Sequence, residues 1–265
     1  FASFQNINNH SEKAKWKGIT KRKFDLVILD ESHYGTATSI ASETLSNLNY
    51  NKALFVSGTP LKALLSGRFS DDNTFTWSYA DEQKKRRVEK GDFKETDQWP
   101  TEIYKYQPIM KAYLYEVCAE AKKNLTAYSD DEGFTMTKLF GANADNTFVD
   151  KASVKLFMDQ IFGRGGIRKN KSPFRTAAVD HSFWALPVSV ASAAALETLL
   201  IDMVGDEYFI INASGGEVSD INKAKKSIAH YDKTITLSCG RFNTGVTVPE
   251  WDAVLMLNDT KSPET

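Results

Sequence analysis

Two unalternating apolar runs near the start of the chain predict its first strands. Residues 26–29 are Leu-Val-Ile-Leu, and residues 53–57 are Ala-Leu-Phe-Val-Ser. Such runs are typical of parallel strands that are buried on both faces of a sheet. Residues 39–48 between them read as a helix, so strand, helix and strand predict one βαβ unit. Residues 74–79 alternate between polar and apolar positions, as a further strand would.

A second series of strands and helices is predicted in the C-terminal part of the chain. Strands are expected at residues 183–188, 208–212, 235–238 and 253–257, and a helix with an Ala/Leu face at 192–203. The residues between the two series are charged and interrupted. Helices are expected there around residues 108–128 and 151–162, followed by a Gly-rich basic loop at 162–173.

Strands that alternate with helices favour parallel sheets. We therefore predict an α/β fold in three parts. Residues 1–95 form the first lobe, residues 96–178 a largely helical connecting region, and residues 179–265 the second lobe.

Composition narrows the possible partners and location. The 265 residues carry a formal net charge of −1, so nucleic acid would have to bind through local basic patches. Cys118 and Cys239 form no CxxC pair, which fits a reducing compartment. No apolar run approaches the roughly 18–20 residues that span a membrane, and no signal peptide is recognisable. These features predict a cytoplasmic protein with no membrane partner. Because the chain starts without Met, as though in mid-strand, we also expect a fragment.

Asp30 and Glu31 directly follow the first predicted strand. The carboxyl ends of parallel strands are where open α/β sheets place ligands. Of two adjacent carboxylates there, one can hold Mg²⁺ through water and the other can orient an attacking water. Acidic residues are also common in turns, and for a bare Asp-Glu pair a simple turn is the commoner explanation.

Four segments together resemble motifs of superfamily 2 helicases. Residues 24–33, Phe-Asp-Leu-Val-Ile-Leu-Asp-Glu-Ser-His, resemble motif II, the Walker B or DEAH-type box. Residues 57–60, Ser-Gly-Thr-Pro, are similar to motif III, and residues 237–254 are similar to motif V and the strand after it. Residues 1–5 are similar to a strand that carries a nucleic-acid-contacting motif. The segments follow the order of the family, and the nearest branch is that of type I and type III restriction motor subunits and phage relatives.

The resemblance implies two RecA-like lobes of the P-loop NTPase fold, each partial, with ATP and Mg²⁺ as cofactors. Asp30 would hold the Mg²⁺ of MgATP through water, and Glu31 would position and activate the hydrolytic water. The coupling of nucleotide state to lobe movement would fall to His33, Ser57 and Thr59. The lobe interface near the nucleotide would contain Thr244, Gly245 and Thr247, although many relatives have Asp at the last position.

Two parts of such an ATP site are missing from the sequence. No G-x-x-x-x-G-K-[ST] motif occurs, and the Gly-rich loop has Asn170 where the glycine before Lys171 should stand. Motif VI, a helix that supplies an arginine finger, should begin just beyond Thr265. We therefore expect these residues alone to hydrolyse ATP poorly or not at all.

Nucleic-acid contacts are expected at Gln5 and at basic patches. Residues 13–23 and 84–87 form two basic runs, and a third patch includes Arg164, Arg168, Lys169 and Lys171. Basic side chains that meet phosphates give salt-dependent affinity. A solvated helix face or loop explains such runs equally well in the first two cases and nearly as well in the third.

The combined hypothesis is an ATP-dependent helicase or translocase motor acting in restriction-modification or phage DNA processing. DNA is the expected partner, with RNA left open, together with restriction-modification or nuclease subunits. One rival is a degenerate RecA-like module that binds nucleic acid or a partner without hydrolysis. Another is a nuclease with Asp30 and Glu31 as metal ligands, but no accompanying lysine and carboxylate are convincingly placed. The sequence does not fix polarity, attached domains or oligomeric state.

Overall fold

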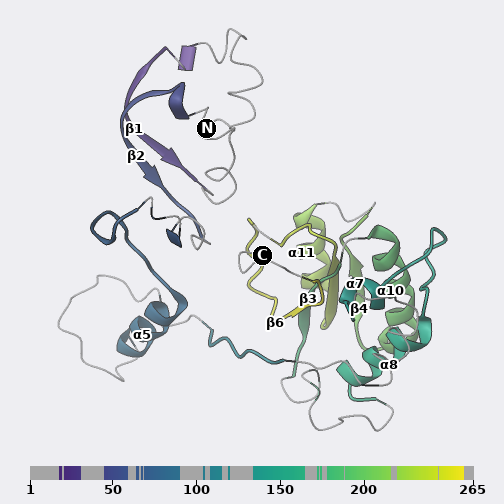
Figure 1. Ribbon diagram of the computed structural model, residues 1–265. Coiled ribbons are helices and arrows are strands. Elements are labelled where there is room, and N and C mark those ends of the chain that lie inside the picture. Colours follow the sequence, from purple (N-terminus) through teal and green to yellow (C-terminus); the bar gives the residue numbers. More distant parts are fainter. Residues whose placement is uncertain are drawn as a thin grey trace. The chain divides into compact units, whose positions relative to one another are not determined.

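The computed structural model divides the chain into two compact units (Figure 1). The first comprises Phe1–Ala112 with Ser262–Thr265, and the second comprises Tyr113–Lys261. The structure describes residues 18–19, 21–30, 45–58, 64–65, 67, 69–89, 104, 108–114, 119, 134–164, 172, 174, 178–187, 189–215, 220–243 and 245–259.

The first unit contains a parallel pair of strands. Strand β1, Lys23–Leu29, pairs with β2, Asn49–Phe55, from Lys23 opposite Asn49 to Leu29 opposite Phe55. The prediction of parallel strands in an α/β protein is therefore confirmed.

Burial of both faces of this pair is not observed. Leu26, Ile28 and Leu54 are exposed, with Ile28 at 61%. Within the described residues this sheet has only two strands, and so small a sheet cannot cover both of its faces.

The strand predicted at residues 74–79 is replaced by a loop and the start of a helix. The short helix η2, Asp71–Asn73, precedes the loop, and α5, Tyr79–Glu89, follows it. The backbone N–H and the hydroxyl of Ser78 both donate to Asp81 Oδ2, at 2.8 and 2.6 Å. Ser78 also accepts a longer bond from the Asp81 N–H at 3.4 Å. This reciprocal capping box starts a helix at Tyr79, and it outweighs the alternation that predicted a strand.

The region predicted as a helical connection contains a segment without helix and two helices that belong to the second unit. Residues 108–114 form no helix, contrary to the prediction. The helix expected at residues 151–162 is present as α8, Lys151–Ile161, preceded by the short helix α7, Met136–Leu139. Both lie in the second unit, so the boundary predicted between residues 178 and 179 falls inside that unit.

The second unit is built on a four-stranded sheet whose paired strands all run parallel. Its strands are β3 (His181–Ala185), β4 (Phe209–Asn212), β5 (Thr234–Ser238) and β6 (Ala253–Met256). They lie in the order β4-β5-β3-β6. All four match predicted strands within a few residues. Helix α10, Val190–Val204, leads from β3 to β4, and α11, Ile221–His230, leads from β4 to β5.

Helices cover both faces of this sheet. On one face, α8 and α10 share a core with Trp184 of β3 and with Ile235 and Leu237 of β5. On the other face, Ala224 and Ile228 of α11 pack with Ile211 of β4. The result is a three-layer α/β arrangement. Among the described residues, no helix combines the length and the apolar character needed to cross a membrane.

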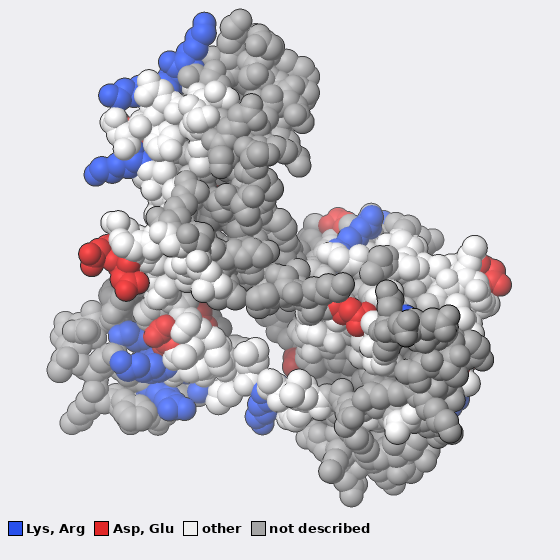
Figure 2. All heavy atoms as spheres, viewed as in Figure 1, with Lys and Arg blue, Asp and Glu red and all other residues white. Residues whose placement is uncertain are grey.

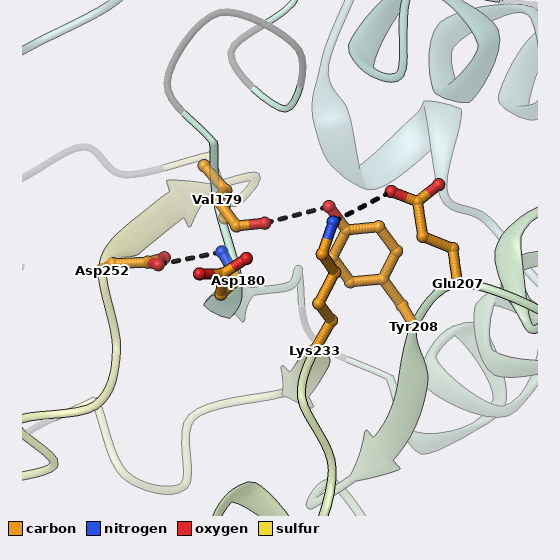
Figure 3. A network of polar contacts seen from close by, with 6 residues as sticks. All are labelled: Val179, Asp180, Glu207, Tyr208, Lys233 and Asp252. Atoms are coloured by element: carbon orange, nitrogen blue, oxygen red, sulfur yellow. Dashed lines mark hydrogen bonds and ion pairs between the residues drawn. The ribbon is translucent and has the colours of Figure 1, made fainter.

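A polar network ties the amino-terminal ends of the strands together (Figure 3). Tyr208, just before β4, donates its hydroxyl to the Val179 carbonyl at 2.9 Å. Lys233 Nζ lies 3.2 Å from Glu207 Oε1 and 5.3 Å from the centre of the Tyr208 ring. Asp252 Oδ2 accepts a bond from the Asp180 backbone N–H at 2.8 Å. These contacts stabilise the sheet at the edge opposite to the one where parallel sheets hold ligands.

Replacing Tyr208 by Phe should change how the protein responds to alkaline pH. Burial raises the pKa of Tyr208 to about 12, and the charges of Glu207, Asp180 and Asp252 add to the effect. Because the folded pKa exceeds the unfolded value, Tyr208 favours folding less and less as pH rises from about 10 through about 12. Urea titrations at several pH values should show a smaller alkaline loss of stability in Tyr208→Phe. At neutral pH the variant should be about 1 kcal/mol less stable, because it lacks one hydrogen bond. Identical alkaline curves for both proteins would contradict this account.

Candidate functional site

The carboxyl edge of the β1–β2 pair brings two predicted site residues to neighbouring strand ends. Asp30 is exposed and directly follows β1. Ser57 is half-buried and lies two positions after β2. A bond of 2.9 Å from the Val56 N–H to the Leu29 carbonyl carries the parallel pairing past the last paired residues of the strands. Asp30 and Ser57 therefore leave the same edge of the sheet.

Asp30 is an exposed carboxylate at the carboxyl end of β1. Its exposed carboxylate supplies the hard oxygen ligand that Mg²⁺ prefers. The described residues contain no cluster of three or more His, Cys, Asp and Glu side chains that could hold a metal by themselves. Mg²⁺ at phosphoryl-transfer sites is commonly bound by one or two carboxylates, water and the phosphates of the substrate.

A hydrogen-bond network joins three loops at the carboxyl edge of the second sheet. The Cys239 N–H, just after β5, donates to Ser214 Oγ at 2.9 Å, and Cys239 Sγ donates to the Ser189 carbonyl at 3.1 Å. Ser189 caps α10 by accepting from the Ser192 N–H at 3.1 Å. On the other side, the Ser214 N–H donates to Asn212 Oδ1 at 3.0 Å. The ends of β4 and β5 and the start of α10 are thereby held together.

Cys239 acts in this network as a structural thiol. Burial raises its pKa, against the lowering effect of its hydrogen bonds with Ser214 and Ser189. A raised pKa keeps the thiol protonated and unreactive near neutral pH. The arrangement therefore gives no indication of cysteine nucleophile chemistry.

The loop between β5 and β6 carries the motif V-like residues. Phe242, Val248 and Trp251 anchor it in the cluster beneath α11. Gly245, with φ of 73°, and Thr247 lie between these anchors and are exposed. A positive φ at residue 245 favours glycine, because a side chain there would be strained. The anchors thus present Gly245 and Thr247 to solvent along a loop that begins at the carboxyl edge of the sheet.

Arg164 and Ser172 make contacts that the sequence did not predict. The guanidinium of Arg164 donates to the Met203 carbonyl in the last turn of α10, where a cation is favoured by the helix dipole. This contact gives Arg164 a structural role, and its contact with nucleic acid stays a prediction. Ser172 is fully buried and its hydroxyl donates to the Ile161 carbonyl. That position agrees with rejecting residues 163–172 as a phosphate-binding loop.

Several predicted site residues lie outside the described part of the chain. They are Gln5, Glu31, His33, Thr59, Arg168, Lys169, Lys171 and Thr244. Of the other predicted residues, Asp30 and Ser57 follow neighbouring strands of the first unit, and Gly245 and Thr247 share one loop in the second. The sequence analysis did not predict a role for Ser189, Ser214 or Cys239. The signal that could have found them is their position shortly after predicted strands.

The comparison with known proteins gives one distant relative. No protein-family model matches the chain. The sequence is similar to that of a Mycoplasma pneumoniae protein named "Putative type II restriction enzyme and methyltransferase RM.MpnORF110P C-terminus". The two are 25% identical over an alignment of 316 positions, which covers 96% of this chain and 44% of the relative. The chain thus spans less than half the length of the curated relative that it matches.

Proposed function

We propose that this chain is part of an ATP-driven DNA helicase or translocase motor that serves a restriction-modification system. The observation that carries the proposal is the placement of Asp30 and Ser57 at the carboxyl ends of neighbouring parallel strands. They stand there in the sequence contexts that resemble motifs II and III. The two α/β units would be two RecA-like lobes. The parallel sheet of the second unit, with helices on both faces, supports this assignment.

In this proposal Asp30 and Glu31 divide the work at the metal-and-water end of an ATP site. Asp30 would hold Mg²⁺ through water, and Glu31 would accept the proton of the attacking water. Mg²⁺ held by Asp30 would supply positive charge to the phosphates. Ser57, on the neighbouring strand end, would sense the nucleotide and pass its state to the rest of the lobe.

The second unit would contribute the loop between β5 and β6. Phe242, Val248 and Trp251 pack into the core cluster on either side of Gly245 and Thr247, so both ends of this exposed stretch are anchored. A loop that is anchored at both ends is suited to meeting a nucleotide or a DNA backbone in one lobe arrangement and leaving it in another. The phosphate cradle and the arginine finger would come from elsewhere in the natural protein, because these residues contain no G-x-x-x-x-G-K-[ST] motif.

The restriction-modification context rests on the similarity to the Mycoplasma pneumoniae protein, whose name gives a restriction enzyme and methyltransferase. DNA is the substrate that both activities share, so we propose DNA as the partner of this chain. The similarity supports only the restriction-modification context. The proposed motor activity rests on the four motif-like segments.

ATP hydrolysis by the natural full-length protein tests the proposal. We expect duplex or single-stranded DNA to raise the steady-state hydrolysis rate by about tenfold, a usual size for coupling between two sites. Phosphate release should be measured without nucleic acid, with DNA, and with mixed-sequence RNA as the comparison. ATP binding without hydrolysis, with or without DNA, would instead favour the non-hydrolysing RecA-like module. DNA cleavage that needs Mg²⁺ but no ATP, and that is lost in Asp30→Asn, would favour the nuclease.

A further inference from the structure

Two exposed aromatic rings precede α5 in the first unit. Phe75 is 82% exposed and Trp77 is 36% exposed. Their rings are nearly parallel, with an angle of 15° between the planes and 6.4 Å between the centres. Trp77 also contacts Tyr104, with 5.7 Å between ring centres. The motifs that support the proposed function do not include these residues.

Local hydrogen bonds fix the backbone on both sides of the two rings. Before them, Thr74 donates its hydroxyl to the Ser70 carbonyl at 2.8 Å and its N–H to the Asp71 carbonyl at 3.2 Å. After them, Ser78 and Asp81 form the capping box that starts α5. The backbone that carries the two rings is therefore constrained by hydrogen bonds on both sides, which reduces the entropy cost of binding a partner.

Basic side chains lie on the helix that follows. Lys84 and Arg87 are exposed on α5, and they lie about 8 and 12 Å along the helix axis from Tyr79. Lys and Arg side chains gather over this helix in Figure 2. Tyr79 and Gln83 anchor the helix instead: the Met110 N–H donates to the Tyr79 hydroxyl at 2.7 Å, and Gln83 Nε2 donates to the Pro108 carbonyl at 3.3 Å.

We propose that Phe75, Trp77, Lys84 and Arg87 form a binding surface for single-stranded DNA, which we call the stacking surface. Unpaired bases would stack on the rings, and the phosphates that follow would lie along the basic side of α5. The choice of DNA over an apolar protein partner rests on Lys84 and Arg87, the exposed cations that follow the acidic first turn of α5.

This assignment rests on the proposed DNA function for its class of partner, but it concerns a surface separate from the ATP site. It also predicts that single-stranded DNA binds more tightly than duplex DNA. Bases inside a duplex have no free faces, so stacking requires unpaired nucleotides. Stacking is tolerant of sequence, because every base has an aromatic face.

The test is binding of the full chain to a labelled oligothymidine of about 15 nucleotides, with a blunt hairpin duplex as the competing probe. Anisotropy should be measured over a series of salt concentrations. Phe75→Ala and Trp77→Ala should each weaken binding to the oligothymidine by about tenfold, without changing the salt dependence. The pair Lys84→Gln with Arg87→Gln should instead reduce the slope of log affinity against log salt by roughly 1.4, because about two phosphate contacts are lost. Phe75→Leu should bind as weakly as Phe75→Ala, since it keeps an apolar group but cannot stack.

Tyr113→Ala is the matched control, because Tyr113 is another exposed aromatic residue, at 55%, and should leave affinity unchanged. Circular dichroism and thermal melting check that each variant folds. Wild-type affinity of Phe75→Ala and Trp77→Ala for the oligothymidine, or equal affinity of the wild type for duplex and single strand, would overturn the stacking surface. If DNA still stimulates ATP hydrolysis in the full-length protein, only this inference fails. If DNA neither binds nor stimulates hydrolysis, the proposed function fails with it.

Discussion

Replacing Trp184 by Ala should lower the free energy of unfolding of the second unit by about 3–5 kcal/mol. Trp184 is fully buried on the central strand β3, between β5 and β6. Its ring lies 6.0 Å from each of the rings of Phe162 and Phe174, measured between centres. Removing the indole would leave a large cavity among side chains that come from different elements and cannot all move to fill it. The size of the effect should be read from urea unfolding followed by far-ultraviolet circular dichroism.

Two further variants separate packing from hydrogen bonding at this position. Trp184 Nε1 donates to Ser182 Oγ at 3.0 Å, and Trp184→Phe removes this bond while keeping most of the ring. Its cost should be about 1–2 kcal/mol, clearly below that of Trp184→Ala. Phe209→Ala is the exposed control, because Phe209 is 38% exposed on the neighbouring β4. A loss below about 1 kcal/mol in Trp184→Ala would show that this aromatic cluster is not the centre of the core.

The second unit was the more predictable of the two because its strands are strongly apolar. Three of the strands followed largely apolar runs, β5 followed the alternating segment Thr-Ile-Thr-Leu-Ser, and the Ala/Leu face of residues 192–203 gave α10. Helix α11 was missed, although Asp220 caps it and Ile221, Ala224 and Ile228 have helical spacing. The many lysines in that segment hid the pattern. The strand order β4-β5-β3-β6 depends on the direction of each crossover, which no local pattern encodes.

Some site residues could be predicted from local sequence, and others are brought together only by the fold. Asp30 and Ser57 were predictable as neighbours, because both follow strands that pair in parallel. The network of Ser189, Ser214 and Cys239 was not, because its members lie 25 and 50 positions apart and meet only when the sheet forms. Arg164 shows another limit of local information: its place in a basic run predicted a contact with nucleic acid, which stays a prediction, but did not reveal its hydrogen bond to the Met203 carbonyl at the end of α10.

In the natural full-length protein, replacing Asp30 by Asn should lower DNA-stimulated ATP hydrolysis by roughly 100-fold or more. Asn keeps the size of the side chain but removes the charge that the proposed site needs to hold Mg²⁺. The loss should be partly relieved when Mn²⁺ replaces Mg²⁺, since a change in the metal ion can compensate for an altered ligand. Glu31→Gln should lose hydrolysis by a similar or larger factor while still binding ATP, because it alters the water rather than the metal.

Asp25→Asn is the matched control, because Asp25 is an exposed carboxylate on the same strand, within β1 rather than after it. Its Oδ1 accepts a hydrogen bond from Asn51 Nδ2 at 3.2 Å, an exposed contact whose loss should cost little. We expect Asp25→Asn to keep at least half of the wild-type rate at all Mg²⁺ concentrations. Equal rates for the wild type, Asp30→Asn and Glu31→Gln would remove these carboxylates from the chemistry. Equal losses in Asp25→Asn and Asp30→Asn would point to damage of the strand itself, because only a role at the carboxyl edge separates the two positions.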